Sequence, residues 1–219
     1  SVQTLADRAT GYIGSFETQF GTREVGVPLL VHRRCAEPMF SISNAVAYEN
    51  LMVQAKRPKQ SSILEVAGPS RWIHVAGNAQ GKWCPQEGQS TLQLLQTIRA
   101  GGCEPDVYIV TPFVDVQNGL RNLLATSSAL SGWVSNPRLW VKERVGTVHT
   151  VQGREAEAVI FVLGAPEAGQ NGARIWAGKS PNLLNVAVTR AKEAVYVIGN
   201  AQAWKDCGVF QTLYKRLIH

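Results

Sequence analysis

The sequence has few cysteines, no long apolar run and only a modest excess of charge of one sign. Its four cysteines are far apart and form no C-x-x-C pair: Cys35, Cys84, Cys103 and Cys207. This scatter favours buried, reduced thiols over a disulfide framework or a zinc site. No apolar stretch approaches the roughly 20 residues of a membrane-spanning helix, and no signal-peptide pattern opens the chain. We therefore expect no membrane contact, no metal site and a cytoplasmic location.

Length and composition fit one large globular domain, or one domain with an appendage. Hydrophobic residues make up 45% of the chain and charged residues 17%, which is ordinary for a globular protein. Lys plus Arg number 22 against 16 for Asp plus Glu, so the net charge is +6. That excess weakly favours polyanionic partners. The first residue is Ser1 and not Met, so we expect a processed product or a piece of a longer protein.

Short apolar strands alternate with amphipathic helices along most of the chain. This alternation predicts an α/β fold with a mostly parallel sheet covered by helices on both faces. We expect residues 1–24 to be a connecting segment with a short helix, and residues 127–144 and 165–180 to be irregular. Strands are predicted at 27–31, 71–77, 107–110, 145–149, 158–163 and 194–200, and the main helices at 37–48, 87–100, 116–128, 181–192 and 201–218.

Polar clusters lie beside four of the predicted strands, where parallel sheets bind ligands at the carboxyl ends of their strands. They are His32–Arg34, Thr111–Phe113, Thr150–Glu155 and Thr189–Arg190. Arginine offers forked donors that suit phosphate, a glutamate accepts from a ribose hydroxyl, and glycine allows close approach of the backbone. Threonine can contact a nucleic-acid backbone. Taken one at a time, each cluster is equally compatible with a solvated or internally paired strand end.

Four sequence segments, considered together, indicate a family more specifically than any single polar cluster does. "TVHTVQGREAEAVIFVLG" resembles motif V of superfamily-1 helicases of the Upf1-like type, and "NVAVTRAKEAVYVIGN" is similar to their motif VI. "LLVHRRCAEPMFSISNAVAY" resembles motif IV, and "VYIVTPFVDVQNGL" resembles the segment that pairs Thr-Pro-Phe with a downstream Gln. The four segments occur in the order of the family and span Val27–Ala201.

The resemblance implies that residues 25–219 form the second, C-terminal motor domain of such a helicase. This domain would have the RecA-like fold, a three-layer α/β arrangement. In that family ATP binds between two such domains, and the second domain supplies two arginines to the γ-phosphate. By motif, those arginines are Arg34 and Arg190, and Glu155 contacts the ribose. Gln152, Gly153 and Arg154 would couple the nucleotide to nucleic acid, and the nucleic-acid contacts would be Thr111, Pro112 and Thr150.

A Walker A motif is missing from the sequence. The nearest segment, "GNAQGKW" at Gly77–Trp83, has one residue too few between its glycines and a tryptophan where Ser or Thr should bind Mg²⁺. We interpret it as a turn with a solvated Lys82. No Walker B pattern follows an apolar strand either. The first motor domain, with the Mg²⁺ ligands, is therefore expected outside this chain, and the chain alone is expected to hydrolyse almost no ATP.

These observations predict the second motor domain of an ATP-dependent helicase or translocase. Its expected partners are the first motor domain and single-stranded nucleic acid, either DNA or RNA. The alternative is a non-catalytic, helicase-like module that binds nucleic acid or protein. A nuclease is disfavoured because the carboxylates are scattered. Trp133 and Trp140 are predicted to pack and not to stack on bases, and the remaining basic residues are interpreted as solvated surface: Lys56, Arg57, Lys59, Lys142 and Arg144.

Overall fold

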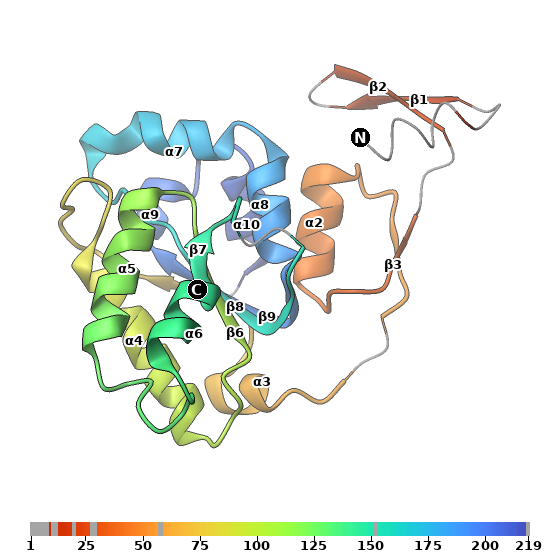
Figure 1. Cartoon of the computed structure of the whole chain (residues 1–219). Coiled ribbons are helices and arrows are strands. Elements are labelled where there is room, and N and C mark those ends of the chain that lie inside the picture. The colour runs from red at the N-terminus through yellow and green to blue at the C-terminus, as the bar shows by residue number, and fades with distance from the viewer. Residues whose placement is uncertain are drawn as a thin grey trace.

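A five-stranded, all-parallel sheet forms the centre of the molecule (Figure 1). The structure is a computed structural model that describes residues 9, 13–18, 21–26, 30–56, 59–150 and 153–217. The strand order is β5-β9-β8-β6-β7, so the α/β fold class predicted from the sequence is confirmed. The strands are β5 (Arg71–His74), β6 (Val107–Thr111), β7 (Val145–Thr147), β8 (Ala156–Val162) and β9 (Ala191–Gly199).

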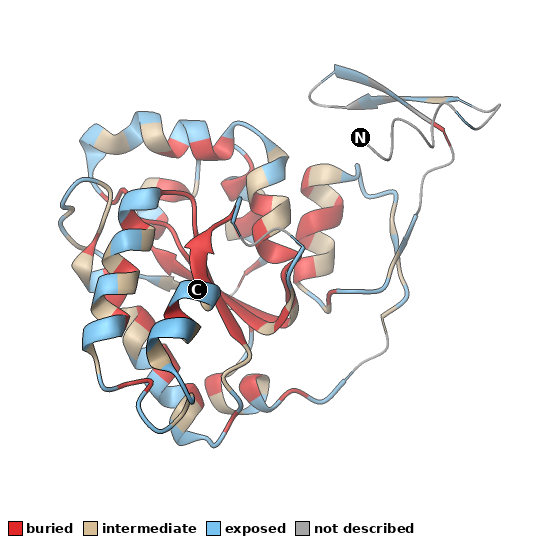
Figure 2. Cartoon of the chain, in the orientation of Figure 1, coloured by how far each residue is buried: buried red, intermediate tan, exposed pale blue. Residues whose placement is uncertain are grey.

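The three central strands, β9, β8 and β6, are almost completely buried, and Figure 2 shows them in red at the core. Strand β8 pairs with β9 from Ala156↔Ala191 to Val162↔Ile198. From Ala158 and Ala194 onward both strands are continuous apolar runs, because a parallel sheet with helices on both faces has no solvated side. The apolar character of these runs therefore places the polar residues just before them at one edge of the sheet.

Two layers of helices cover the sheet. Contacts link α3, α4, α5 and α6 in one layer, and α2, α8, α10, α7 and α9 in the other. The first layer comprises α3 (Ser62–Ala67), α4 (Pro85–Ala100), α5 (Val114–Thr126) and α6 (Pro137–Arg144). The second comprises α2 (Met39–Ala47), α7 (Asn171–Gly178), α8 (Pro181–Val188), α9 (Ala201–Trp204) and α10 (Phe210–Arg216). The three-layer arrangement is the one that the alternating sequence pattern predicts.

Local signals fix where helix α8 begins. Ser180 has extended backbone, its hydroxyl oxygen accepts a hydrogen bond from the Asn182 amide at 3.4 Å, and Pro181 occupies the first turn. Proline suits that position because its missing amide hydrogen has no partner there in any helix. The start of this helix, predicted from Ser180 and Pro181, is confirmed.

Several sequence-based expectations about irregular regions are wrong. Residues 127–144 contain α6, which begins at Pro137 after an Asn136 cap, and residues 165–180 contain the 3₁₀ turn η1 (Ala168–Gln170) and α7. These helices have three to eight residues, too few for helical periodicity to identify them. The segment 1–24 holds most of a β-hairpin, β1 (Gly14–Thr18) and β2 (Gly21–Val25), which stands apart from the α/β body in Figure 1.

The strand predicted at 27–31 is also different. Residues 27–29 lie outside the described part of the chain, and β3 (Val31–His32) pairs with β4 (Val53–Gln54) in a separate two-stranded ribbon. Val31 and Val53 are 54% and 62% exposed, so this ribbon is not a buried strand of the main sheet.

Side-chain packing agrees with several smaller predictions. All four cysteines are free and buried. The indole nitrogens of Trp133 and Trp140 donate to the backbone oxygens of Cys103 and Pro105 at 2.8 and 3.3 Å, and both rings pack against the core. Within the described residues, no helix combines the length and apolar character that crossing a membrane requires.

Candidate nucleotide and nucleic-acid sites

The pairing of β8 with β9 brings Glu155 next to Arg190. Glu155 immediately precedes β8, and Arg190 lies between the end of α8 and the start of β9. The amide of Ala156 donates to the carbonyl oxygen of Arg190 at 3.0 Å, which holds the two strand starts together. Two residues that are 35 positions apart are thus neighbours because of the sheet register.

Arg34 also lies beside Glu155, although it belongs to the segment that follows β3. The segment after β3 is attached to the start of β9 by the Ala36 amide, which donates to the carbonyl oxygen of Lys192 at 2.8 Å. The thiol of Cys35 lies 3.7 Å from the carbonyl oxygen of Thr189. These contacts hold the backbone of Arg34 against motif VI.

Arg34, Glu155 and Lys192 form a charged cluster at the surface. The Arg34 Nε atom lies 2.6 Å from Glu155 Oε1, and Lys192 Nζ lies 3.9 Å from Glu155 Oε2. The side chains are between 33% and 44% exposed. Solvent therefore screens this cluster, and exposed pairs of this kind typically contribute about 0.2–1 kcal/mol.

Arg190 has a different environment. It is only 7% exposed, and its guanidinium donates to the carbonyl oxygens of Val186 and Arg154 at 3.2 and 3.1 Å. No carboxylate of the described residues lies within ion-pair distance of it. Burial lowers the pKa of Arg190, and the positive charge of Arg34 lowers it further. A buried guanidinium without a carboxylate partner favours an incoming anion.

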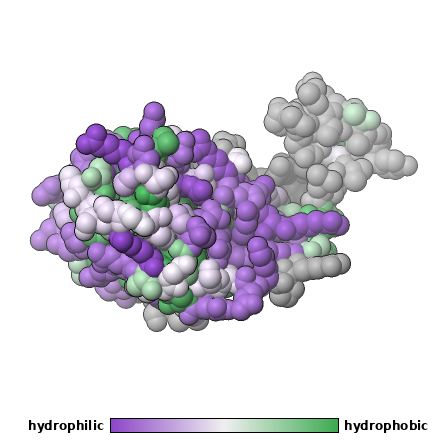
Figure 3. Space-filling view, turned by 60° about the horizontal axis from the view of Figure 1, so that its bottom comes forward, coloured by the Kyte–Doolittle hydropathy of each residue, from purple (hydrophilic) through white to green (hydrophobic). Residues whose placement is uncertain are grey.

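A cavity of about 830 Å³ joins these groups. Arg34, Glu155 and Arg190 all line it, so the structure brings together the three residues expected to contact a nucleotide. Its charged lining has six cations and two carboxylates: Arg33, Arg34, Lys56, Lys59, Arg190 and Lys192 against Glu155 and Glu193. This donor set suits a polyphosphate. Figure 3, which turns the lower edge of Figure 1 forward, shows a face dominated by hydrophilic side chains.

Two lysines of this cavity were interpreted as solvated surface from the sequence. Lys56 Nζ lies 2.6 Å from Glu193 Oε2, and its side chain is 12% exposed, so that interpretation is wrong for Lys56. Lys59 is exposed but also lines the cavity. No local sequence pattern indicates the Lys56 contact, because its partner Glu193 is 137 positions away.

Lys82, also predicted to be solvated, is partly paired. Its Nζ atom lies 3.6 Å from Asp115 Oδ2, and its side chain is 40% exposed.

Two other titratable side chains beside the cavity are neutral at pH 7. Burial raises the pKa of the Cys35 thiol to about 12, despite the nearby charges of Arg34, Lys56 and Arg190. Burial, followed by the charge of Arg34, lowers the pKa of His32, whose Nε2 accepts from the Cys35 amide at 3.1 Å. Neither group adds charge to the cavity. Among the described residues there is no cluster of three or more side chains able to hold a metal ion.

The residues expected to contact nucleic acid lie outside this cavity. Thr111 and Pro112 are buried, and the Thr111 hydroxyl oxygen accepts from the Phe113 amide at 3.3 Å. Gln117, the glutamine downstream of this Thr-Pro-Phe segment, accepts from the Thr147 amide at 2.9 Å. Thr111 and Pro112 therefore shape the end of β6 in this conformation, and their side chains are not on the surface.

Thr150 is exposed and lies with Arg154 in a second, smaller hollow of about 230 Å³. Arg121 and Lys142 add positive charge to its lining. The Arg154 side chain donates to the carbonyl oxygen of Glu143 at 3.1 Å, while its own carbonyl oxygen accepts from Arg190. Arg154 thus connects the two hollows. Gly153 is exposed with φ +87°, and Gln152 lies outside the described residues.

One geometric expectation is wrong. The four polar clusters were all expected near carboxyl ends of strands, yet Glu155 and Arg190 lie at the amino ends of β8 and β9. Thr111 lies at the carboxyl end of β6. Because all five strands are parallel, the cavity with the arginines and the Thr-Pro-Phe segment are at opposite edges of the sheet. The sequence already places Glu155 and Arg190 before their strands, so the expectation failed because it counted every polar residue beside a strand as lying at the carboxyl end.

Comparisons with protein families and with solved structures each found a match. A family model described as an AAA domain matches residues 16–202. A solved structure, the C-terminal domain of a possible DNA helicase from Lactobacillus plantarum WCFS1, is similar at 11% identity and a TM-score of 0.46, covering 85% of this chain and 94% of that chain. Among curated proteins, none matches the chain. Since the family model covers most of the sequence, the chain belongs to the AAA_12 family of AAA domains, the C-terminal RecA-like domain of Upf1-like superfamily-1 helicases.

Proposed function

We propose that this chain is the second motor domain of an ATP-dependent nucleic-acid helicase or translocase. The observation that carries the proposal is the convergence of Arg34, Glu155 and Arg190 on one cavity of about 830 Å³. Groups from motifs IV, V and VI thus line one cavity, where two guanidinium groups and one carboxylate can contact the same ligand. The four buried, free thiols suit a reducing compartment, and we place the protein in the cytoplasm.

The residues that line the cavity are suited to contact one side of a nucleoside triphosphate. Arg190 offers donors from a buried position, Arg34 and Lys192 add positive charge, and the Glu155 carboxylate can accept from a ribose hydroxyl. We propose that Arg34 and Arg190 stabilise the charge that develops on the transferring γ-phosphoryl group. Mg²⁺, held by the first motor domain, would neutralise further charge on the phosphate oxygens. The open side of the cavity would be closed by that first domain.

Arg34 has to exchange partners in this scheme. Its Nε atom is 2.6 Å from Glu155, so the same carboxylate is occupied before nucleotide enters. When a ribose hydroxyl takes Glu155, Arg34 becomes available to the phosphate. The exchange is inexpensive because the pair is 33–40% exposed and solvent-screened.

The proposal is tested by ATP hydrolysis in a protein that joins this chain to a first motor domain. We expect Arg190→Ala to lower strand-stimulated kcat by about 10³-fold or more. The thermal unfolding midpoint should also fall, because the carbonyl oxygens of Val186 and Arg154 lose their donor, but the protein should remain folded at the assay temperature. Arg190→Lys should restore little, because lysine keeps the charge but loses the forked donors. Arg216→Ala, at the exposed end of α10, is the matched control and should be neutral.

Near-normal ATPase in the Arg190→Ala protein would refute the assignment. If the wild-type fusion binds a single strand but never hydrolyses ATP, the chain is instead a non-catalytic binding module.

A further inference from the structure

Trp176 is a large aromatic side chain left on the surface of α7. The residue is 54% exposed, although the same helix buries Arg174 and Ala177. Arg174 anchors the helix, because its guanidinium donates to the carbonyl oxygens of Ala165 and Glu167, both at 2.7 Å. Trp176 is therefore presented by a fixed element, and its exposure is not the result of a loose chain end.

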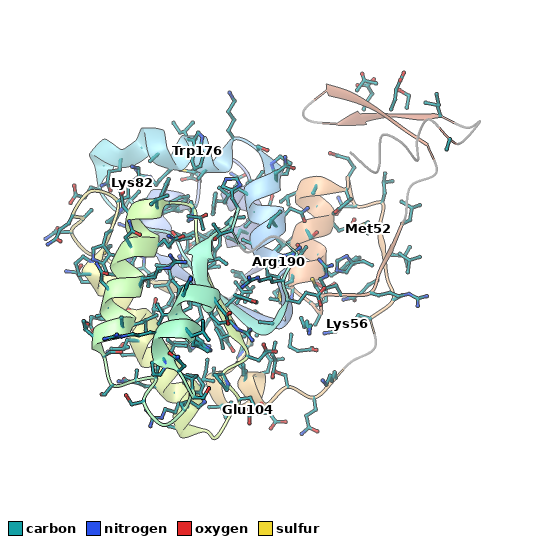
Figure 4. The ribbon with its side chains drawn as sticks, in the orientation of Figure 1. Met52, Lys56, Lys82, Glu104, Trp176 and Arg190 are labelled. Carbon is teal, nitrogen blue, oxygen red and sulfur yellow. The ribbon has the colours of Figure 1, made fainter. Side chains whose placement is uncertain are left out.

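One side of the Trp176 ring is supported by Phe113. The two ring centroids are 6.0 Å apart with an interplanar angle of 34°, and Phe113 is in turn 6.3 Å from Trp204 in the core. Lys82 Nζ lies 5.6 Å from the centroid of the Phe113 ring. Figure 4 shows Lys82 and Trp176 near each other at the top of the molecule, with Arg190 and Lys56 lower and to the right. The structure thus places an exposed aromatic surface with a cation beside it, away from the arginine cavity.

This aromatic surface lies next to residues that are expected to contact the nucleic-acid strand. Phe113 directly follows Thr111 and Pro112 at the carboxyl end of β6, and Val114, the next residue, is 58% exposed. Thr150 follows β7, the neighbouring strand, at the same edge. Val114, Ile175 and Trp176 are each more than half exposed, so apolar and aromatic surface is available to a partner here. A nucleobase fits it better than an apolar peptide does, because a flat ring can stack on the exposed Trp176 indole and the net charge of the chain, +6, favours a polyanion.

We propose that Trp176 is a stacking platform for an unpaired nucleobase of the bound single strand. The proposal rests on the proposed function, since it requires that this edge of the sheet faces the strand. Aromatic side chains stack on bases without regard to sequence, and each such contact contributes about 1–3 kcal/mol by alanine substitution. Trp176 would grip the strand through its bases, while Thr150 and nearby cations contact the phosphates.

Binding of labelled oligonucleotides to the 219-residue chain, followed by fluorescence anisotropy, tests the idea. We expect Trp176→Ala to weaken binding of a 12-nucleotide oligo-dT or oligo-rU about 5- to 100-fold, and Trp176→Phe to weaken it less. An abasic oligonucleotide of the same length, which has phosphates but no bases, should bind wild type and Trp176→Ala equally. Ile175→Ala is the matched control, because Ile175 is 53% exposed on the same helix.

The outcomes separate this inference from the function on which it rests. If oligo-dT and oligo-rU bind and Trp176→Ala behaves like Ile175→Ala, the platform is refuted and strand binding stands. Equal weakening for the abasic strand would also refute it, since stacking would not be the cause. If wild type binds no oligonucleotide, the platform and the strand-binding part of the proposed function both fail.

Discussion

At the scale of single residues, the two arginines of the cavity differ in a way that their motifs do not reveal. Arg190 is 7% exposed and contacts backbone carbonyl groups. Arg34 is paired with Glu155 in a partly exposed ion pair. A buried guanidinium is preorganised for an anion, because no free energy is spent on ordering its side chain when the anion binds. Arg34 must instead give up a partner, so its contribution depends on what else binds Glu155.

This difference predicts that Glu155 opposes phosphate binding. We expect Glu155→Gln to tighten binding of inorganic tripolyphosphate to the chain by roughly 1.5- to 5-fold, the range that an exposed ion pair allows. Arg34→Ala should weaken it. Isothermal titration calorimetry measures both, with Glu104→Gln as a control that removes one exposed negative charge outside the cavity. Weaker tripolyphosphate binding by Glu155→Gln would contradict the exchange of partners.

At the scale of elements, helix α7 depends on a close backbone crossing. Gly178, its last residue, is so near Cys207 that a Cβ atom added there would overlap the Cys207 carbonyl oxygen. The Val209 amide donates to the Gly178 carbonyl oxygen at 3.1 Å. This contact fixes the C-terminal end of α7 against the turn between α9 and α10, and with it the helix that carries Trp176.

Gly178→Ala is therefore expected to lower the free energy of unfolding by about 2–4 kcal/mol, because backbone and not a flexible side chain must move. Gly172→Ala, in the same helix, meets nothing within 4 Å. We expect it to be neutral or to stabilise by roughly 0.5 kcal/mol through helix propensity. Urea denaturation of the two variants makes the comparison. Equal stability would show that α7 does not need the crossing.

At the scale of the whole molecule, the two proposed ligand regions lie at opposite edges of one parallel sheet. The arginine cavity is at the amino ends of β8 and β9, and the Thr-Pro-Phe segment is at the carboxyl end of β6. Arg154 lines the smaller hollow, and its carbonyl oxygen accepts a hydrogen bond from Arg190, which lines the arginine cavity. A contact of this kind carries coupling only if it has two arrangements that the ligands bias differently.

The isolated chain should therefore bind tripolyphosphate and a nucleic-acid single strand at the same time. At constant ionic strength, saturating tripolyphosphate is expected to change the dissociation constant of oligo-dT by less than about threefold, a coupling below roughly 1 kcal/mol. The measurement is an anisotropy titration of oligo-dT with and without tripolyphosphate, balanced with chloride salt because strand binding depends on salt. Full competition would place the strand in the arginine cavity and contradict the separation of the sites.

The sequence by itself determined the central strands and the larger helices, whereas the grouping of Arg34, Glu155 and Arg190 was an expectation from the resemblance to the helicase family. Short, continuous apolar runs between turn residues are typical of strands in a covered parallel sheet, and capping residues such as Ser180 act within one turn. Only the tertiary structure decided the pairing of Lys56 with Glu193 and the placement of Trp176 beside Phe113. Those features join residues 63 or more positions apart, and sheet register and helix packing set them, not any local pattern.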